Sequence, residues 1–211
     1  MAGKKKQKRR GGSVMGRSDI PYAQRLAMER IGNIAANRET AAQAAMLCAS
    51  VAMHEQKGIG YKRLVRFSLR LKQVIDEFYE DVEVGMAHAK VRMEQMGMPI
   101  SGELFTVEAA GRTARQLELD NHKLQASQIA LICAAIAMND EFGFGQEVQT
   151  RISQRTAELA ERYGREGMGF LLVEMEKIGF KIADGKALAF VDDDGSPVTM
   201  RKAMEEGFTD G

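Results

Sequence analysis

Tryptophan is absent from this 211-residue sequence, and aromatic residues make up only 6% of it. Only two cysteines occur, Cys48 and Cys133, whereas an extracellular disulfide scaffold uses more, so we expect the reducing cytoplasm of a host cell. No run of 18 apolar residues is present to span a bilayer, and no apolar segment follows the basic N-terminus as in a secretory signal. These absences predict a cytoplasmic protein without a membrane partner.

The residues that are present are those of a folded, helical protein. Apolar residues make up 45% and charged residues 28%, which is typical of globular domains. The 14 methionines suit irregular gaps between packed helices, and they also suit adaptable binding surfaces.

Charge is distributed unevenly along the chain. Residues 1–17 contain no acid and seven basic residues, which are Lys4, Lys5, Lys6, Lys8, Arg9, Arg10 and Arg17. Removing these seven from the 30 basic residues leaves 23 against 29 acidic residues, a net charge of −6. A cationic arm joined to an acidic body commonly binds nucleic acid, while a disordered solubilising tail is the alternative.

Apolar periodicity predicts a mainly α-helical chain. One helix is expected from about Ser18 to Arg38, and whether it continues into the Ala-rich buried helix Ala41–Met53 stays open. The sequence Gly58-Ile59-Gly60 ends that helix, an amphipathic helix follows over Tyr61–Glu80, and a shorter one over Val84–Met96.

The helical pattern repeats. When the sequence is shifted by 85 residues, Gln43–Phe78 aligns with Gln128–Tyr163, and after a three-residue slip the short helix also finds a counterpart. A leading helix of the second copy is expected from Val107 to Gln125, capped by Thr106. Two copies of one unit are expected to pack about a pseudo-two-fold axis, or side by side as in a solenoid.

The predicted organisation has four segments. A disordered basic arm (1–17) precedes helical repeat 1 (18–100) and helical repeat 2 (101–182). Residues 183–211 form a small β-hairpin and tail, with strands at 187–191 and 197–199 around an Asp-Gly turn.

The first Gly-x-Gly is the most promising candidate site. Glycines between two helices let backbone N–H groups at the start of the second helix approach an anion closely. The alternative is that the glycines only end one helix and start another. The predicted nucleic-acid contacts are the arm residues Lys4, Lys5, Lys6, Lys8, Arg9 and Arg10, and, at the joint, Lys57, Gly58, Gly60, Lys62, Arg63, Arg66 and Arg70.

Gly58-Ile59-Gly60, followed by Leu64 and Phe67, resembles the hairpin of helix-hairpin-helix DNA-binding modules. In that family a Gly-apolar-Gly hairpin clasps phosphates, usually in pairs. The resemblance covers about 20 residues in each copy. Lys57 stands where that family often has proline, and the second copy carries acids around its glycines.

The stretch Asn139-Asp140-Glu141-Phe142-Gly143-Phe144-Gly145 resembles a segment of small, uncharacterised helical proteins of bacteriophages and prophages. The resemblance implies a phage or prophage origin and no particular activity.

Residues for catalysis are sparse. The three histidines do not recur between the copies and form no metal-spaced cluster, so we expect no cofactor and no metal. Glu55 and Asp140 recur beside the glycines, and Asp140-Glu141 is the one candidate pair for a divalent cation. Both cysteines lie in Ala-rich helices, where a packing role is expected. A metal-dependent nuclease would need further acids and a lysine in register.

The sequence therefore predicts a non-catalytic nucleic-acid-binding accessory protein, with DNA favoured over RNA. The alternative is a protein-binding inhibitor or adaptor that acts on a host complex. For that alternative the surface to inspect is the methionine patch Met86, Met93, Met96 and Met98.

Overall fold

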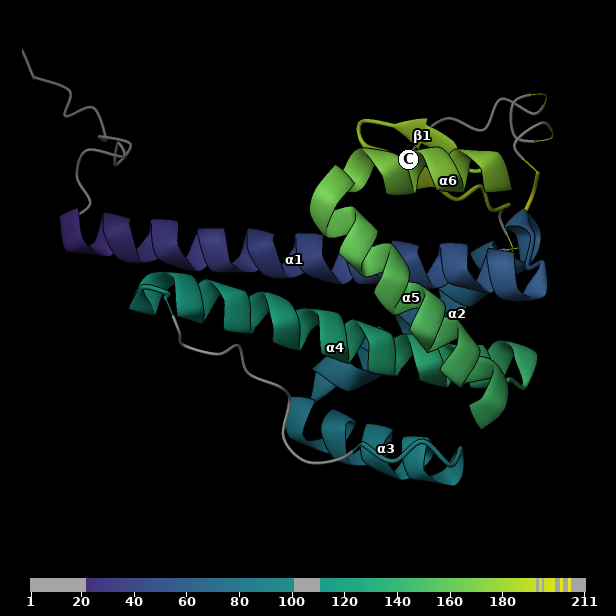
Figure 1. Cartoon of the computed structure of the whole chain (residues 1–211), viewed down its shortest axis with the longest axis horizontal. Coiled ribbons are helices and arrows are strands. Elements are labelled where there is room, and N and C mark those ends of the chain that lie inside the picture. The colour runs from purple at the N-terminus through teal and green to yellow at the C-terminus, as the bar shows by residue number, and fades with distance from the viewer. Residues whose placement is uncertain are drawn as a thin grey trace, which may run out of the picture. The chain divides into compact units, whose positions relative to one another are not determined.

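The computed structural model describes residues 22–100, 111–192, 194, 196–199, 202 and 205. The predicted basic arm, the helix start at Ser18 and the predicted cap Thr106 lie outside these residues. Within them the protein is mainly helical, with six helices and one small two-stranded antiparallel sheet (Figure 1). By compactness the chain divides into residues 1–36 and residues 37–211.

The described part of the first unit, residues 22–36, is the N-terminal part of α1 (Tyr22–Lys57). The question that the sequence left open is thereby answered: a single helix of 36 residues runs to the first Gly-x-Gly. Its residues are mostly Ala, Glu, Arg, Gln and Met, which lose little free energy in a helix. Within residues 22–36, Leu26, Met28 and Ile31 are exposed.

In the second unit the centre is a pair of Ala-rich helices, residues 37–57 of α1 and α4 (Ala114–Phe142). Small side chains bring the two backbones close, and the Ser127 hydroxyl donates a hydrogen bond across the pair to the Ala41 carbonyl at 3.3 Å. α4 begins at Thr113, which forms a reciprocal capping box with Gln116. The helix predicted to lead the second copy is thus continuous with the buried helix that follows it.

Two amphipathic helices cross this central pair, α2 (Tyr61–Glu80) and α5 (Gln146–Glu166) (Figure 1). α2 packs against α4 and buries an apolar stripe that includes Leu64 and Phe67. The matching stripe of α5 contains Gln149 and Ile152, which are also buried. The core of this unit is one continuous cluster to which all six helices contribute.

The short helices α3 (Val82–Gln95) and α6 (Met168–Ile178) follow α2 and α5. The chain leaves both in the same way. Gly97 and Gly179 adopt positive φ angles of 74° and 112°, in the left-handed region that glycine tolerates. After α3, Met98 N–H donates to the Met93 carbonyl at 2.8 Å; after α6, Phe180 N–H donates to the Met175 carbonyl at 3.1 Å. Both ends have the backbone pattern of a Schellman motif.

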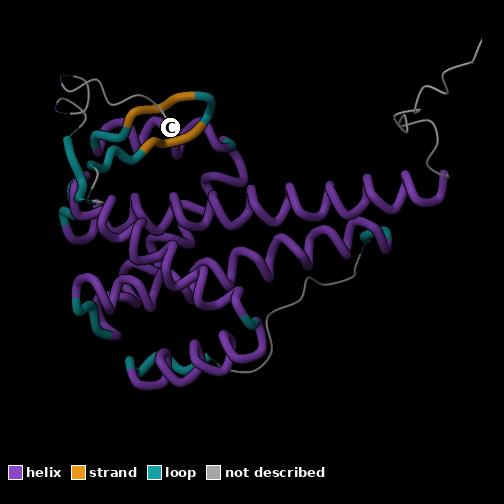
Figure 2. Tube along the Cα trace, turned by 180° about the vertical axis from the view of Figure 1, so that it is seen from behind, coloured by secondary structure: helices purple, strands orange, loops and turns teal. Residues whose placement is uncertain are grey.

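The C-terminal hairpin exists, but its strands are not those predicted. β1 (Lys181–Ala183) pairs with β2 (Lys186–Leu188), as Figure 2 shows. The turn uses Asp184 and Gly185, both at positive φ, which is the geometry of tight Asp-Gly hairpins. The expected pairing of 187–191 with 197–199 is reduced to a single bridge, Val191 with Pro197. Two Asp-Gly pairs are available in the sequence, and the hairpin forms at the first.

No helix in the described parts of the chain has the length and apolar character that crossing a membrane requires.

Candidate nucleic-acid interface

The first glycine joint connects α1 to α2 in three residues. Gly58 has a φ of 60°, in the left-handed region, and its N–H donates to the His54 carbonyl at 2.7 Å. Ile59 is buried, and His54 Nδ1 lies within hydrogen-bond distance, 3.0 Å, of its carbonyl oxygen. Gly60 is extended and precedes the first turn of α2. The joint is therefore anchored to the core, so the start of α2 has a fixed position.

The second joint, between α4 and α5, has the same backbone geometry. Gly143 has a φ of 65°, and its N–H donates to the Asn139 carbonyl at 2.8 Å. The Asn139 side chain donates to the Phe144 carbonyl at 3.2 Å, in the place of the contact between His54 and Ile59.

Lys57, Lys62 and Arg63 are all exposed at the first joint. Arg63 lies over the ring of Phe142, 4.9 Å from its centroid, and this contact orients the guanidinium at the surface. No acid stands in the first turn of α2, and no side chain caps it. Because the helix dipole disfavours cations at an N-terminus, this arrangement costs stability unless an anion is bound.

Arg66 and Arg70, also predicted to contact nucleic acid, are paired with acids at the end of α4. Arg66 forms an ion pair with Glu141. Arg70 donates to Asp140 Oδ2 from Nε at 2.8 Å and from Nη2 at 2.6 Å, and its side chain is only 29% exposed. These two arginines are therefore less able to contact a phosphate than Lys62 and Arg63.

Asp140 is the centre of this charge cluster. Arg92, which the sequence did not single out, forms an ion pair with its second oxygen, Oδ1. Burial by itself raises the pKa of Asp140, but the hydrogen bonds and charges of Arg92 and Arg70 outweigh it, and the pKa lies below its ordinary value. The Asp140 carboxylate is thus held ionised between two arginines.

A reciprocal ion pair lies on α1 and α5. Arg155 Nε donates to Glu55 Oε2 at 2.6 Å, and its Nη1 donates to Glu158 at the same distance. Hydrogen bonds from Glu55 and Glu158 raise the pKa of Arg155. Arg155 and Glu55 are the 85-residue counterparts of Arg70 and Asp140, so each amphipathic helix holds the end of the other copy's Ala-rich helix.

The surroundings of the two joints differ in charge. The first turn of α5 contains Glu147, which pairs with Arg151 at 3.3 Å. Asp140 and Glu141 close α4 just before the second joint. An anion is therefore expected at the first joint and disfavoured at the second.

The other candidates from the sequence are largely accounted for by packing. Cys48 and Cys133 are buried free thiols, and burial raises the pKa of each to about 11. In the methionine patch Met93 is buried, and the other three members are half-buried against the core. Among the described residues, no group of three or more His, Cys, Asp or Glu side chains is placed to hold a metal ion.

Comparison with protein-family models, curated proteins and solved structures finds no match to this chain.

Proposed function

We propose that this protein is a non-catalytic nucleic-acid-binding accessory protein whose structured contact is the first glycine joint. The observation that carries the proposal is the pair of exposed cations, Lys62 and Arg63, on an acid-free, uncapped first turn of α2. Free N–H groups at such a turn and adjacent cations together favour a phosphate. α5, with Glu147 in its first turn, lacks this combination.

The basic residues of 1–17 would add affinity that does not depend on nucleic-acid sequence. We propose DNA rather than RNA as the ligand, because the modules that the Gly-apolar-Gly joint resembles bind DNA. A phage or prophage origin belongs to the same proposal and rests on the resemblance of residues 139–145.

We further infer that residues 18–100 and 101–182 descend from one duplicated unit and are related by a pseudo-two-fold axis. Three features support this inference: the matching joints, the matching ends of α3 and α6, and the reciprocal pairs Arg70–Asp140 and Arg155–Glu55. In this account the second copy kept the fold and lost the cations, so a single joint contacts nucleic acid.

Fluorescence anisotropy of a labelled DNA duplex tests the proposed contact in the full chain. The double variant Lys62→Glu/Arg63→Glu should bind on the order of 10-fold more weakly, because two attractions become repulsions. The control Arg115→Glu/Lys186→Glu changes the net charge equally at two exposed positions away from the joint and should differ little from the unmodified chain.

Circular dichroism of both variants checks that they are folded. Equal losses in the two double variants would show that only net charge matters, and no loss in either would remove the joint from the interface. A duplex RNA of the same sequence gives the comparison of DNA with RNA.

A further inference from the structure

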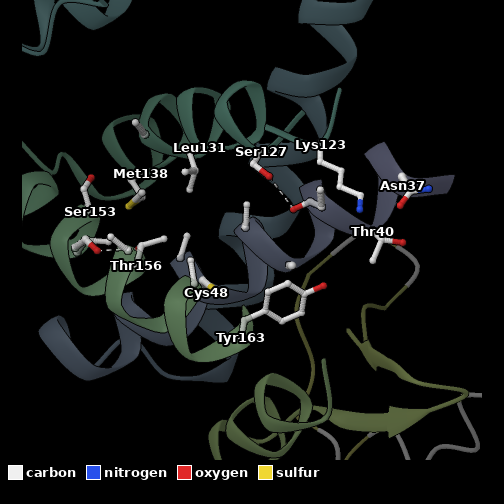
Figure 3. A pocket seen from close by; sticks show the side chains of 18 residues that line it. Asn37, Thr40, Cys48, Lys123, Ser127, Leu131, Met138, Ser153, Thr156 and Tyr163 are labelled. Atoms are coloured by element: carbon white, nitrogen blue, oxygen red, sulfur yellow. Dashed lines mark hydrogen bonds between the residues drawn. The ribbon is translucent and has the colours of Figure 1, made fainter. Parts of the chain in front are cut away.

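A groove of about 610 Å³ lies between residues 37–49 of α1, α4 and α5, away from the glycine joints. Cavities that bind small molecules commonly have this size and are mostly apolar, with a few polar groups placed to orient the ligand. Figure 3 shows its two ends: Asn37, Thr40 and Lys123 at one, and Ser153 and Thr156 at the other.

The walls between these ends are apolar. Eleven of the 18 residues that line the groove are Ala, Cys, Ile, Leu or Met. Leu131 is 37% exposed on one wall although it is a large aliphatic residue. The Cys48 thiol also lines the groove and is neutral at physiological pH because burial raises its pKa to about 11. This lining suits a hydrocarbon chain.

Lys123 gives the groove a charged end. Its side chain is half-buried, and no carboxylate lines the groove among the described residues. No ion pair joins Lys123 to another described residue, whereas many basic residues of α2 and α5 are paired. In Figure 3 its amino group points toward Thr40, and the Tyr163 hydroxyl is turned to the same end. A half-buried ammonium with hydroxyl neighbours favours an anion.

The groove is widened by substitutions between the two copies. Leu71, Lys72 and Ile75 on α2 correspond at 85 residues to Thr156, Ala157 and Ala160 on α5, and each residue on α5 is smaller. The three residues on α2 line a groove of about 440 Å³ that is also lined by residues of α6 and the hairpin.

From these observations we propose that the groove binds a small amphiphile with an aliphatic chain and a carboxylate. The chain lies along the alanine-lined wall, and the carboxylate pairs with Lys123. This site is independent of the proposed nucleic-acid contact, since none of its lining residues belongs to the first glycine joint.

Because the chain has no tryptophan, a single introduced tryptophan reports on the groove without background. In Tyr163→Trp the indole replaces a ring that lines the groove; in the control Tyr79→Trp it replaces an exposed ring that does not. Titration with dodecanoate, below its micellar concentration, should shift the emission of Tyr163→Trp to the blue with saturation. The emission of Tyr79→Trp should not change.

Charge is tested on the Tyr163→Trp background with dodecanoate and with dodecanol, its neutral counterpart. Lys123→Gln should weaken dodecanoate binding about 10-fold and leave dodecanol binding unchanged, because only the carboxylate needs the ammonium. Lys177→Gln, which removes an exposed lysine paired with Glu174, should change neither. Equal effects of Lys123→Gln and Lys177→Gln on dodecanoate would overturn the proposed head-group contact.

Ala157→Phe tests the site for the chain, since Ala157 is exposed on the groove wall and its replacement fills open space. This variant should lose binding of both ligands while its thermal unfolding midpoint stays near that of its parent. Unchanged binding in Ala157→Phe, or the lack of any saturable shift in Tyr163→Trp, would refute the proposal.

Discussion

Replacement of Asp140 by alanine tests the charge cluster that holds α2 and α3 to the end of α4. Asp140 accepts two hydrogen bonds from Arg70, at 2.8 and 2.6 Å, and is ion-paired with Arg92, while its own side chain is 21% exposed. A hydrogen bond to a charged group contributes about 1.5 kcal/mol at the lower end of the usual range. The arginines are about a third exposed and regain water in the variant, so solvent screening reduces the sum. We expect Asp140→Ala to lower the free energy of unfolding by about 2 kcal/mol.

Urea denaturation at neutral pH, followed by circular dichroism, measures this loss. The control is Asp76→Ala, which removes an exposed carboxylate paired with Lys72 on the same helix. That variant should lose less than about 0.5 kcal/mol, as is usual for surface pairs.

The effect of Asp140→Ala should also depend on pH in one direction. The pKa of Asp140 is lower in the folded protein than its ordinary value, so the folded state favours the ionised carboxylate. Its contribution is complete above the unfolded pKa of about 3.9 and is lost as the pH falls through the lower folded pKa. The difference between the unmodified chain and Asp140→Ala should therefore shrink below about pH 4. An equal loss in Asp140→Ala and Asp76→Ala, or a difference that persists unchanged at acidic pH, would refute the reasoning.

Three further predictions concern the joint and its surroundings. Gly58→Ala should cost about 1 kcal/mol because Gly58 has a positive φ of 60°, whereas Gly60→Ala, at a φ of −82° with open space around it, should cost much less; thermal unfolding of both variants checks this difference. Tyr61→Phe should cost on the order of 1–3 kcal/mol because the buried N–H of Phe190, 2.7 Å from the Tyr61 hydroxyl, loses its acceptor, and hydrogen exchange of that amide should accelerate; an unchanged exchange rate would contradict the contact. The two buried thiols, with pKa values of about 11, should resist iodoacetamide at pH 8 and react at once in urea, so rapid alkylation of the folded chain would show that they are accessible.

Much of the fold was predictable because the signals were local. The helix over Tyr61–Glu80 has the predicted bounds, since its apolar stripe is regular and glycine precedes it. The small antiparallel hairpin near the C-terminus is also confirmed, but its register is not. Short strands carry few residues, and two Asp-Gly pairs compete for the turn, so local sequence could not decide between them.

The candidate site was less predictable, because pairing between distant residues decides which charges are available. The five basic residues from Lys57 to Arg70 look alike in the sequence. Only the approach of α4 to α2 shows that Arg66 and Arg70 are engaged by Glu141 and Asp140. Arg92 joins the same cluster from α3, and only its tertiary position indicates this role.

The salt dependence of DNA binding tests the central claim most directly. Lys57, Lys62 and Arg63 are the three exposed cations at the joint, and each phosphate neutralised contributes about −0.9 to the log–log slope of affinity against salt. The full chain and the variant Lys57→Ala/Lys62→Ala/Arg63→Ala should therefore differ in slope by about 2.7 on the same duplex. Identical slopes for the two proteins would contradict the account, because the joint would then make no contact with phosphate.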